Sequence, residues 1–536
     1  MIRINELKLP LDYTDDMLKK AAAKAINIDM SKIKNIKLVK RSVDARHKDS
    51  IMFTASVETE LSIDENSVLR RSRSNKISKA ERYVYRFPEG RVFSQPPVIV
   101  GAGPAGLFAA LVLAQAGHCP ILIERGKSVD ERTNDTEMYW SSGVLNTESN
   151  VQFGEGGAGA FSDGKLNTAT KDPRCRKVLE EFVLHGAPEE ILWKAKPHIG
   201  TDNLKPTVKS IRNDIISLGG QVLFSTKLID INVKNGKAVG AVVEHDGVSR
   251  VISTEHIILA IGHSARDTFD MLYDRGFAME AKPFSVGVRI EHLQEQVNRS
   301  QYGAFFDHPR LGAADYKLNV HLMSGRGVYT FCMCPGGYVV ASASEEGTIV
   351  TNGMSEFARN GKNANSALLV GVSPSDYGSE SPLAGIDFQR KIERAAFAAG
   401  GAGGKAPCTR VGDFLNRKKS SSFGSVLPTY RPGVEFALPD DYLPGYVCES
   451  LREGIAILEK RLHGFSDPDA LLTGAETRSS SPVRILRSDN LSSLNVEGVF
   501  PCGEGAGYAG GIVSAAADGI RCAEGLIMNY SKRHKS

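Results

Sequence analysis

One stretch near residue 100 constrains the fold of this chain more than any other. A short apolar strand runs into Gly101, Gly103 and Gly106, an apolar helix pattern follows, and a second apolar strand ends at Glu124. In such a unit the first glycine permits a tight turn, the second admits a pyrophosphate, and the third lets helix and strand pack closely. Unpaired N–H groups at the helix N-terminus then face the phosphates. The sequence therefore predicts an adenine-dinucleotide site.

The context of these glycines makes the motif specific. Glycines at the same spacing recur in 154–159 and 505–510, but only the first copy has a strand, a helix, a second strand and an acid around it. A glycine-rich turn without a ligand is the alternative that this context disfavours. Glu124 can accept hydrogen bonds from an adenosine ribose and disfavours a 2′-phosphate, so FAD or NAD fits better than NADP.

Length and composition indicate a soluble protein of two or three domains. The chain has 536 residues, of which 53 are glycine and only 8 are cysteine, too few for a secreted disulfide scaffold. No signal peptide and no apolar run of membrane-spanning length is evident, so we expect a cytoplasmic protein without a membrane span. The histidines are scattered and no C-x-x-C pair occurs, so we predict no metal site.

The basic charge is concentrated at the N-terminus. Residues 1–96 hold 20 Lys and Arg against 13 Asp and Glu, a net charge of +7, whereas the rest of the chain has a net charge of −3. Such a segment can bind nucleic acid or an acidic partner. A solvated basic face is the preferred interpretation, because no aromatic platform accompanies the charge.

Two further glycine-rich segments point to a flavin. In 499–519 a strand, a glycine loop and a helix follow one another, and a helix N-terminus stabilises the negative charge that appears on a reduced flavin. This segment resembles the second FAD motif of glutathione-reductase and fumarate-reductase type flavoproteins, with Glu504 where that family usually has Asp. The 150–166 stretch has no flanking strand or helix and is similar to the loop beside their isoalloxazine ring, a plain surface loop being the alternative.

Together with 260–267, 331–337, 360–367 and 477–484, these segments resemble the family of uncharacterised bacterial FAD-dependent dehydrogenases, sometimes labelled NAD(FAD)-utilising. The resemblance implies noncovalent FAD and an α/β fold. We expect a GR2-type Rossmann-like FAD-binding domain, an inserted α+β substrate domain and a small N-terminal α/β domain. The predicted boundaries are 1–95 for a basic β-α-β-β domain, 96–282 and 482–536 for the two parts of the FAD-binding domain, and 283–481 for the inserted domain. Within the first, 62–80 is expected to be a polar loop.

The motifs and the resemblance assign FAD contacts to residues of the three glycine-rich segments and of the chain between them. They are Gly101, Gly103, Pro104, Ala105, Gly106, Glu124, Arg125, Arg132, Gly154, Gly156, Gly157, Val222, Gly262, Gly503, Glu504, Gly505, Ala506, Gly511 and Ile512.

Four residues are candidates for proton or electron transfer. Cys332 and Cys334 would face one surface of a strand, where a dithiol can relay electrons or one thiolate can act as acid or base. The preferred interpretation is two buried cysteines that pack as small apolar groups. His263 and Lys165 are the other two candidates. Arg289, Arg410 and Arg484 could bind an anionic substrate, although a salt bridge is the commoner role of such residues.

The sequence thus predicts an FAD-dependent oxidoreductase that transfers a hydride between flavin N5 and a small-molecule substrate. No second nucleotide-binding unit is evident, so NAD(P)H would either act as a transient electron donor or not be used. Two alternatives stay open: an RNA-modifying flavoenzyme that holds nucleic acid through its N-terminal domain, and a non-catalytic flavin-binding sensor or scaffold. No oligomeric state is predicted.

Overall fold

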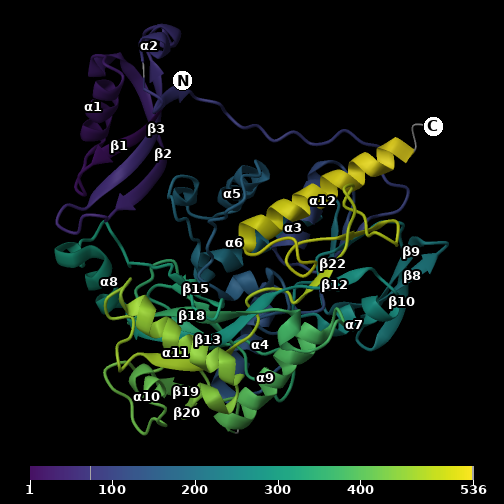
Figure 1. Cartoon of the computed structure of the whole chain (residues 1–536). Coiled ribbons are helices and arrows are strands. Elements are labelled where there is room, and N and C mark those ends of the chain that lie inside the picture. The colour runs from purple at the N-terminus through teal and green to yellow at the C-terminus, as the bar shows by residue number, and fades with distance from the viewer. Residues whose placement is uncertain (73, 402, 534–536) are drawn as a thin grey trace.

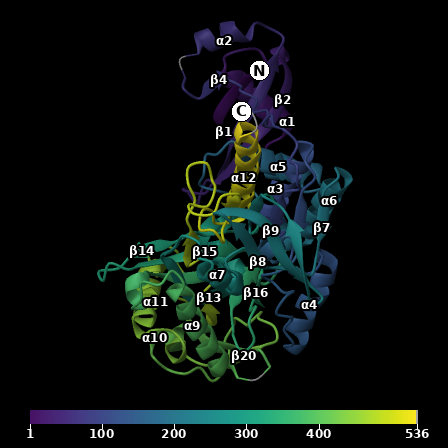
Figure 2. The ribbon, with the colours of Figure 1, turned by 90° about the vertical axis from the view of Figure 1, so that its right-hand side faces the viewer.

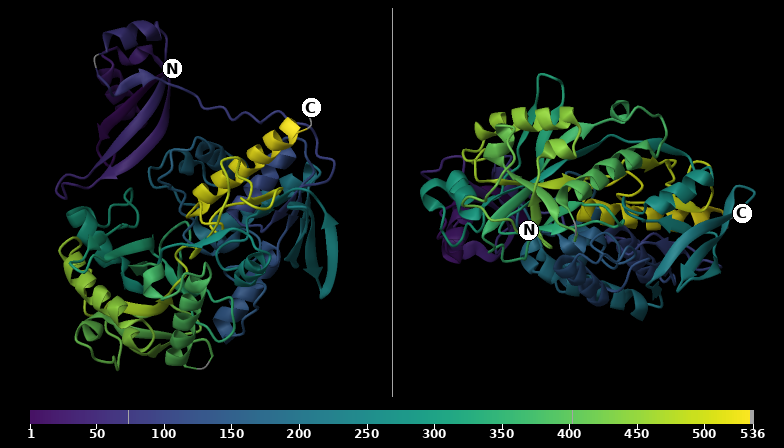
Figure 3. Two further views of the ribbon diagram at one scale, coloured as in Figure 1. Left: turned by 45° about the vertical axis from the view of Figure 1, so that its right-hand side comes forward. Right: turned by 90° about the horizontal axis from the view of Figure 1, so that it is seen from below.

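The computed structural model describes residues 1–72, 74–401 and 403–533. An N-terminal sheet stands beside the rest of the chain and is joined to it by a long extended segment (Figures 1 and 3). Strand order in this sheet is β2-β3-β1-β4. Its elements are β1 (Ile2–Leu9), α1 (Asp15–Ala25), β2 (Ile33–Asp44), β3 (Met52–Leu61), α2 (Glu65–Arg71) and β4 (Ile77–Lys79).

The expected β-α-β-β order is present, but the polar loop predicted for 62–80 is wrong. Asp64 caps α2 by accepting hydrogen bonds from the N–H groups of Asn66 and Ser67, and β4 then pairs with β1. An N-cap acid followed by a short helix offers little apolar periodicity, so the sequence pattern missed both elements.

A five-stranded parallel sheet forms the centre of the molecule, with strand order β23-β11-β5-β6-β7. Its strands are β5 (Val98–Val100), β6 (Ile121–Ile123), β7 (Gln221–Leu223), β11 (Ile257–Leu259) and β23 (Val499–Pro501). Because they are parallel, their carboxyl ends meet at one edge, where ligands of such sheets bind. β23 comes from the end of the chain, so the sheet is assembled from segments about 400 residues apart.

Helices bury this sheet. The first of them, α3 (Pro104–Gln115), is apolar on all sides because it packs against α6 (Gly200–Ser217) and against α12 (Ile512–Arg533), which runs beside it (Figure 2). The extended segment after β4 lies against α12, where Tyr85 donates a hydrogen bond to Glu524 at 2.9 Å. Other helices on this part of the chain are α4 (Val129–Ser142), α5 (Arg174–Leu184) and α7 (Arg266–Asp274). A three-stranded antiparallel meander, β8 (Thr226–Lys234), β9 (Lys237–His245) and β10 (Val248–Ser253), projects from it (Figure 3).

A seven-stranded mixed sheet with order β14-β15-β18-β13-β21-β19-β20 lies between β11 and β23 in sequence. Its strands are β13 (Phe284–Leu293), β14 (Asn319–His321), β15 (Gly327–Cys334), β18 (Asn363–Val372), β19 (Ala406–Arg410), β20 (Val434–Phe436) and β21 (Leu471–Glu476). Helices α9 (Ala384–Gly400) and α11 (Gly445–Glu459) cover it, and α8 (Gln294–Tyr302) and α10 (Val411–Leu415) flank it. The hairpin β16 (Tyr338–Ala341) and β17 (Thr351–Met354) packs beside it, and β12 (Met279–Ala281) pairs with β22 (Val483–Ile485) where the chain enters and leaves. We call this part the cap.

The N-terminal sheet touches both other parts. The backbone N–H of Arg41 donates to the carbonyl of Trp193 at 2.7 Å, and the N–H of Ala195 donates back to Arg41 at 2.9 Å. On the cap side, Arg310 donates to the carbonyls of Leu11 and Tyr13 at 3.1 and 2.8 Å. Across the described ranges, no helix combines the length and the apolar character needed to cross a membrane.

Candidate functional site

A cavity of about 430 Å³ opens between the carboxyl edge of the parallel sheet and the cap. Ligand sites in proteins have volumes of roughly 300–1,000 Å³. Most residues predicted from the sequence line it: Gly101, Gly103, Pro104, Ala105, Glu124, Arg125, Gly157, Lys165, Gly262, His263, Cys332, Cys334, Glu504, Gly511 and Ile512. The other predicted contacts, Gly106, Arg132, Gly154, Gly156, Val222, Gly503, Gly505 and Ala506, are not among its lining residues.

The first glycine turn is shaped for close backbone approach. A Cβ on Gly101, whose φ is +99°, would lie 2.4 Å from the Ala260 carbonyl oxygen, and one on Gly106 would lie 1.8 Å from the Gly101 oxygen. A Cβ on Gly103 would meet only the Gly157 Cα, at 3.8 Å, so it would fit without a clash. Gly103 is the N-cap of α3 and no side chain caps this helix. The first amides of α3 are therefore open to a phosphate.

Glu124 organises the backbone around this turn. Its carboxylate, 5% exposed, accepts hydrogen bonds from the N–H groups of Ala102, Gly126 and Gly154 at 2.7, 2.9 and 2.9 Å. The residue still lines the cavity. The acid predicted to meet a ribose thus also ties the turn after β5 to the glycine-rich loop.

The two arginines after Glu124 have different roles. Arg125 lines the cavity, forms ion pairs with Glu148 and Asp267 at 2.8 Å each, and lies 4.2 Å from the centre of the Phe153 ring. Arg132 is fully buried and donates only to backbone carbonyls of the glycine-rich loop, at Asn150, Val151, Gly154 and Glu155. Arg132 therefore stabilises the loop through its backbone carbonyls and does not line the cavity.

The glycine-rich loop packs directly on the first turn. Gly156 donates its N–H to the Ala102 carbonyl at 2.8 Å, and a Cβ on Gly157 would lie 3.0 Å from the Gly103 Cα. A short 3-10 helix, Gly157–Phe161, follows, which the sequence did not indicate. The loop then carries Asp163 and Lys165 into the cavity.

The second glycine segment contributes a partly buried acid, Glu504. Gly511, with φ +106°, precedes α12, and a Cβ there would meet no atom within 4 Å. Burial raises the pKa of Glu504 to about 7, partly offset by a hydrogen bond from the Gly511 backbone. His263 Nδ1 lies 3.7 Å from the Glu504 carboxylate. Burial, assisted by Arg478 and Arg266, lowers the pKa of His263 to about 3, so this imidazole is neutral at physiological pH.

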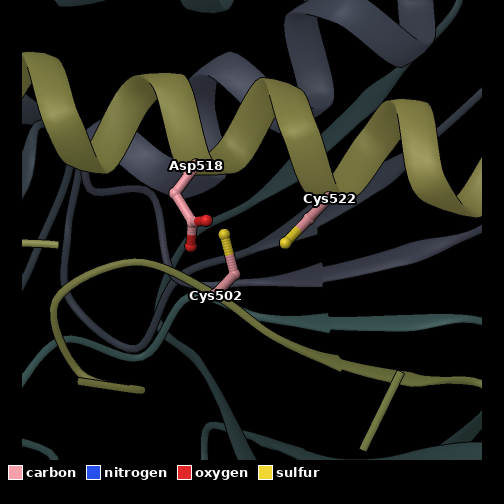
Figure 4. Close-up of side chains that lie close together, drawn as sticks. All are labelled: Cys502, Asp518 and Cys522. Carbon is pink, nitrogen blue, oxygen red and sulfur yellow. The ribbon is translucent and has the colours of Figure 1, made fainter. Parts of the chain in front are cut away.

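A cluster of metal-ligand types lies just behind this segment (Figure 4). Among the described residues, the ligand atoms of Cys502, Asp518 and Cys522 lie within 4.8 Å of one another, and all three residues are buried. Asp518 already forms an ion pair with Arg487 at 2.7 Å, and Arg487 also donates to the Cys522 sulfur at 3.4 Å. Because a guanidinium supplies the positive charge, the cluster holds α12 against the loop after β23 rather than presenting a cation site.

The cap wall carries the chemically reactive side chains. Cys332 is exposed to the cavity and Cys334 is buried beside it. Opposite them, Asp163 forms ion pairs with Lys165 at 2.9 Å and with Arg359 at 2.5 Å. Sequence reasoning missed Asp163 and Arg359, because only the fold brings 163 and 359 together.

The three arginines proposed for an anionic substrate do not line the cavity. Arg289 is fully buried in an ion pair with Glu476, Arg410 lies near Asp413 and Asp469, and Arg484 is paired with Glu280. The arginines that do line it are Arg125, Arg359 and Arg478.

Comparisons with known proteins agree with this geometry. Residues 97–193 match an FAD binding domain, residues 283–479 match the FAD-dependent protein C-terminal domain, and residues 1–60 match a domain of unknown function, DUF8436. A protein of Clostridium beijerinckii described as uncharacterized is 50% identical over 532 residues, 99% of each chain.

Solved structures match this chain only at low identity and low TM-score. A quinol fumarate reductase of E. coli is 11% identical, with a TM-score of 0.37 over 83% of this chain and 71% of that one. A flavoprotein/dehydrogenase of Cytophaga hutchinsonii is 12% identical, with a TM-score of 0.36 over 82% of this chain and 79% of that one. The flavin-dependent brominase Bmp2 is 13% identical, with a TM-score of 0.38 over 81% and 79%. At this level the similarity carries no argument about the reaction.

Proposed function

Because this chain belongs to a family of bacterial FAD-dependent flavoproteins, we propose that it is an oxidoreductase that transfers a hydride between flavin N5 and a small-molecule substrate. The cofactor is FAD. When bound, FAD supplies the hydride acceptor and donor. The protein must then bind, orient and shield the reactants.

The residues on the cavity wall fit this cofactor. The uncapped N-terminus of α3 and the lack of a side chain at Gly103 suit a pyrophosphate, and Gly262 and Gly511 leave open space where a Cβ would otherwise intrude. Glu504, held by the Gly511 N–H, suits a hydroxyl-bearing chain nearby. These residues would hold FAD without a covalent bond.

One observation carries the proposal: the same cavity joins the dinucleotide turn to titratable side chains of the cap. Gly103 and Glu124 line it beside the parallel sheet, Cys332 lines it from the cap, and Lys165 of the glycine-rich loop reaches the cap at Met333. A purely structural cofactor needs no such groups beside it.

The basic N-terminal charge has a simpler explanation than nucleic acid. Exposed Lys34, Lys37 and Lys40 lie on β2, an edge strand of its sheet, and exposed Lys79 lies on β4, the other edge. Charged side chains on edge strands hinder pairing with other chains. The position of these lysines on edge strands accounts for the basic charge without RNA, which supports the small-molecule oxidoreductase over the RNA-modifying alternative.

The test is anaerobic stopped-flow absorbance near 450 nm of the FAD-loaded protein mixed separately with NADH and NADPH. Rapid bleaching by either supports the oxidoreductase and identifies the transient donor. If neither bleaches the flavin, a panel of alcohols, amines and acids is tried as direct donors. The proposal is overturned if no donor reduces the bound flavin and no acceptor reoxidises flavin reduced by dithionite faster than buffer does.

A further inference from the structure

The cap strand that faces the cavity is broken at Cys332. Pairing of β15 with β18 shifts register between Phe331 and Cys334, and Cys332 has a φ of +43°. A non-glycine residue in this region costs on the order of 1–3 kcal/mol and persists only where neighbours hold it. Here Arg289 donates to the Cys332 carbonyl at 3.2 Å. The bulge leaves the Cys332 thiol exposed to the cavity while Cys334 stays buried.

The residues that hold this bulge are themselves fixed. Arg289 is fully buried, donates twice to Glu476 at 2.6 and 3.0 Å, and donates to Asn365 at 3.0 Å. Its guanidinium therefore cannot move without breaking a buried ion pair. The backbone at Cys332 is therefore held in place by the sheet.

A second cation reaches the same place from the glycine-rich loop. Lys165 forms an ion pair with Asp163 at 2.9 Å and also donates to the Met333 carbonyl, one residue past Cys332. Asp163 is 2% exposed and is held in turn by Arg359 through two hydrogen bonds. The loop predicted to pass beside the flavin is thus tied to the cap wall at the thiol.

The protonation states suit an acid. Desolvation by the protein atoms around the cavity raises the pKa of Cys332 to about 12, while Lys165 and Arg289 favour its thiolate and Cys334 and Glu476 oppose it. The thiol keeps its proton at neutral pH. Asp163 raises the pKa of Lys165, so a thiolate formed in a reaction would face an ammonium and a guanidinium.

Resting on the oxidoreductase function proposed above, we propose that Cys332 is the acid of a reduction at a polarised C=C or C=O double bond. One atom of the double bond receives the hydride from the reduced cofactor, and the other receives the proton of Cys332. The S–H bond breaks, one C–H and one C–H or O–H bond form, and the substrate gains two electrons. A nicotinamide donor supplies the hydride to the cofactor, and water reprotonates the thiolate. Lys165 acts as a positioning residue that stabilises this thiolate.

The kinetic test separates the two halves of the reaction. FAD-loaded wild type, Cys332→Ala, Cys332→Ser and Cys119→Ser are first reduced with NADH, NADPH or dithionite, then mixed anaerobically with a panel of α,β-unsaturated acids, aldehydes and ketones. Because a general acid contributes about 10²–10⁴ in rate, Cys332→Ala should slow reoxidation by the best acceptor about 100-fold or more, far more than it slows reduction. Cys332→Ser should restore part of the loss. Cys119 is exposed and does not line the cavity, so its variant is the matched control.

The outcomes distinguish this inference from the proposed function. Reoxidation of Cys332→Ala at the wild-type rate, or failure of every double bond to reoxidise the wild type, overturns the inference even if NAD(P)H bleaches the flavin. The function itself is overturned only if no donor reduces the bound flavin and no acceptor reoxidises dithionite-reduced flavin faster than buffer does.

A second readout needs no substrate. Iodoacetamide labelling, mapped by peptide mass spectrometry, is compared at Cys332 and Cys119 in apoprotein and in FAD-loaded protein. A thiol that faces the cofactor should label at least 10-fold more slowly when FAD is bound, with Cys119 unchanged. Equal labelling of Cys332 in both forms contradicts its place at the cofactor.

Discussion

Arg41 of the N-terminal sheet forms a parallel β-bridge with Lys194. Four residues further along the chain, the same segment pairs with a residue that lines the cavity. There His198 forms an antiparallel bridge with Lys165, the ammonium that reaches the cap wall at Met333. One short extended segment, 194–198, therefore links the N-terminal sheet to a candidate catalytic wall. The N-terminal domain is positioned to brace the site.

Replacing Arg41 tests that brace. Its guanidinium lies 4.5 Å from the centre of the Phe53 ring and 4.7 Å from that of Trp193. Each cation–π contact contributes about 0.5–1 kcal/mol, so Arg41→Ala should loosen the sheet by about 1–2 kcal/mol. We expect several-fold faster proteolysis between residues 80 and 97. Arg46→Ala, which loses only an exposed pair with Asp44, is the control. Equal cleavage of the two variants would contradict the prediction.

A side chain at Gly103 should block the cofactor without unfolding the protein. Gly103 lines the cavity at the N-cap of α3, and a Cβ there would contact only the Gly157 Cα, at 3.8 Å. Gly103→Ala should lower FAD affinity at least 10-fold, measured by titration of apoprotein with FAD, with little change in the melting temperature of the apoprotein. Gly445→Ala places a methyl group in open space outside the cavity and should leave the affinity unchanged. Wild-type affinity in Gly103→Ala would exclude this turn as the pyrophosphate site.

Glu504 should make the apoprotein less stable as pH rises. Its pKa is about 7 in the folded chain against an ordinary value of 4.5, because burial disfavours the charge. The folded state therefore holds a proton that the unfolded state has lost, and stability present below pH 4.5 is lost between pH 4.5 and 7. The shift corresponds to about 3 kcal/mol.

Urea unfolding at pH 4.5 and pH 8 measures this effect. The decrease in unfolding free energy over that range should be smaller in Glu504→Gln than in wild type by on the order of 3 kcal/mol. Other titrating groups, including His263 and Lys282 nearby, contribute to both proteins. The same decrease in both would show that Glu504 ionises normally.

Removing a buried carboxylate from the cap should be costly. Glu393, fully buried on α9, forms ion pairs with Arg266 at 2.8 Å and Arg478 at 3.0 Å. Breaking a buried pair costs about 3–5 kcal/mol, so Glu393→Gln should lower the unfolding free energy by that amount. Asp387→Asn on the same helix, where the side chain is 77% exposed, should change it by about 1 kcal/mol or less. Equal effects would contradict the role of the buried network.

The parts of the site that are local in sequence could be predicted. The turn from Gly101 to Gly106 follows from a strand, three glycines and a helix, and the second motif before α12 has the same logic. Helices α6 (Gly200–Ser217) and α12 (Ile512–Arg533) are also indicated by local sequence. In each the periodicity of apolar residues is strong and continuous.

Contacts between distant segments could not be predicted. The pairing of Asp163 with Arg359 spans 196 residues, and the carbonyl-binding role of Arg132 depends on the path of the loop it supports. The bulge at Cys332 is a shift in the register between β15 and β18. The alternation of side chains along a single strand does not reveal such a shift. The prediction that Arg289 binds an anionic substrate was wrong, because Arg289 forms a buried ion pair with Glu476, which lies on another strand.

A crystal structure of the FAD-loaded protein tests the central claim most directly. We expect a pyrophosphate at the N-terminus of α3 beside Gly103. We also expect the isoalloxazine ring to contact the glycine-rich loop and to lie within reach of Lys165 and Cys332. A flavin ring outside the cavity, or turned away from the cap wall, would contradict the account and leave Cys332 without a role in the reaction.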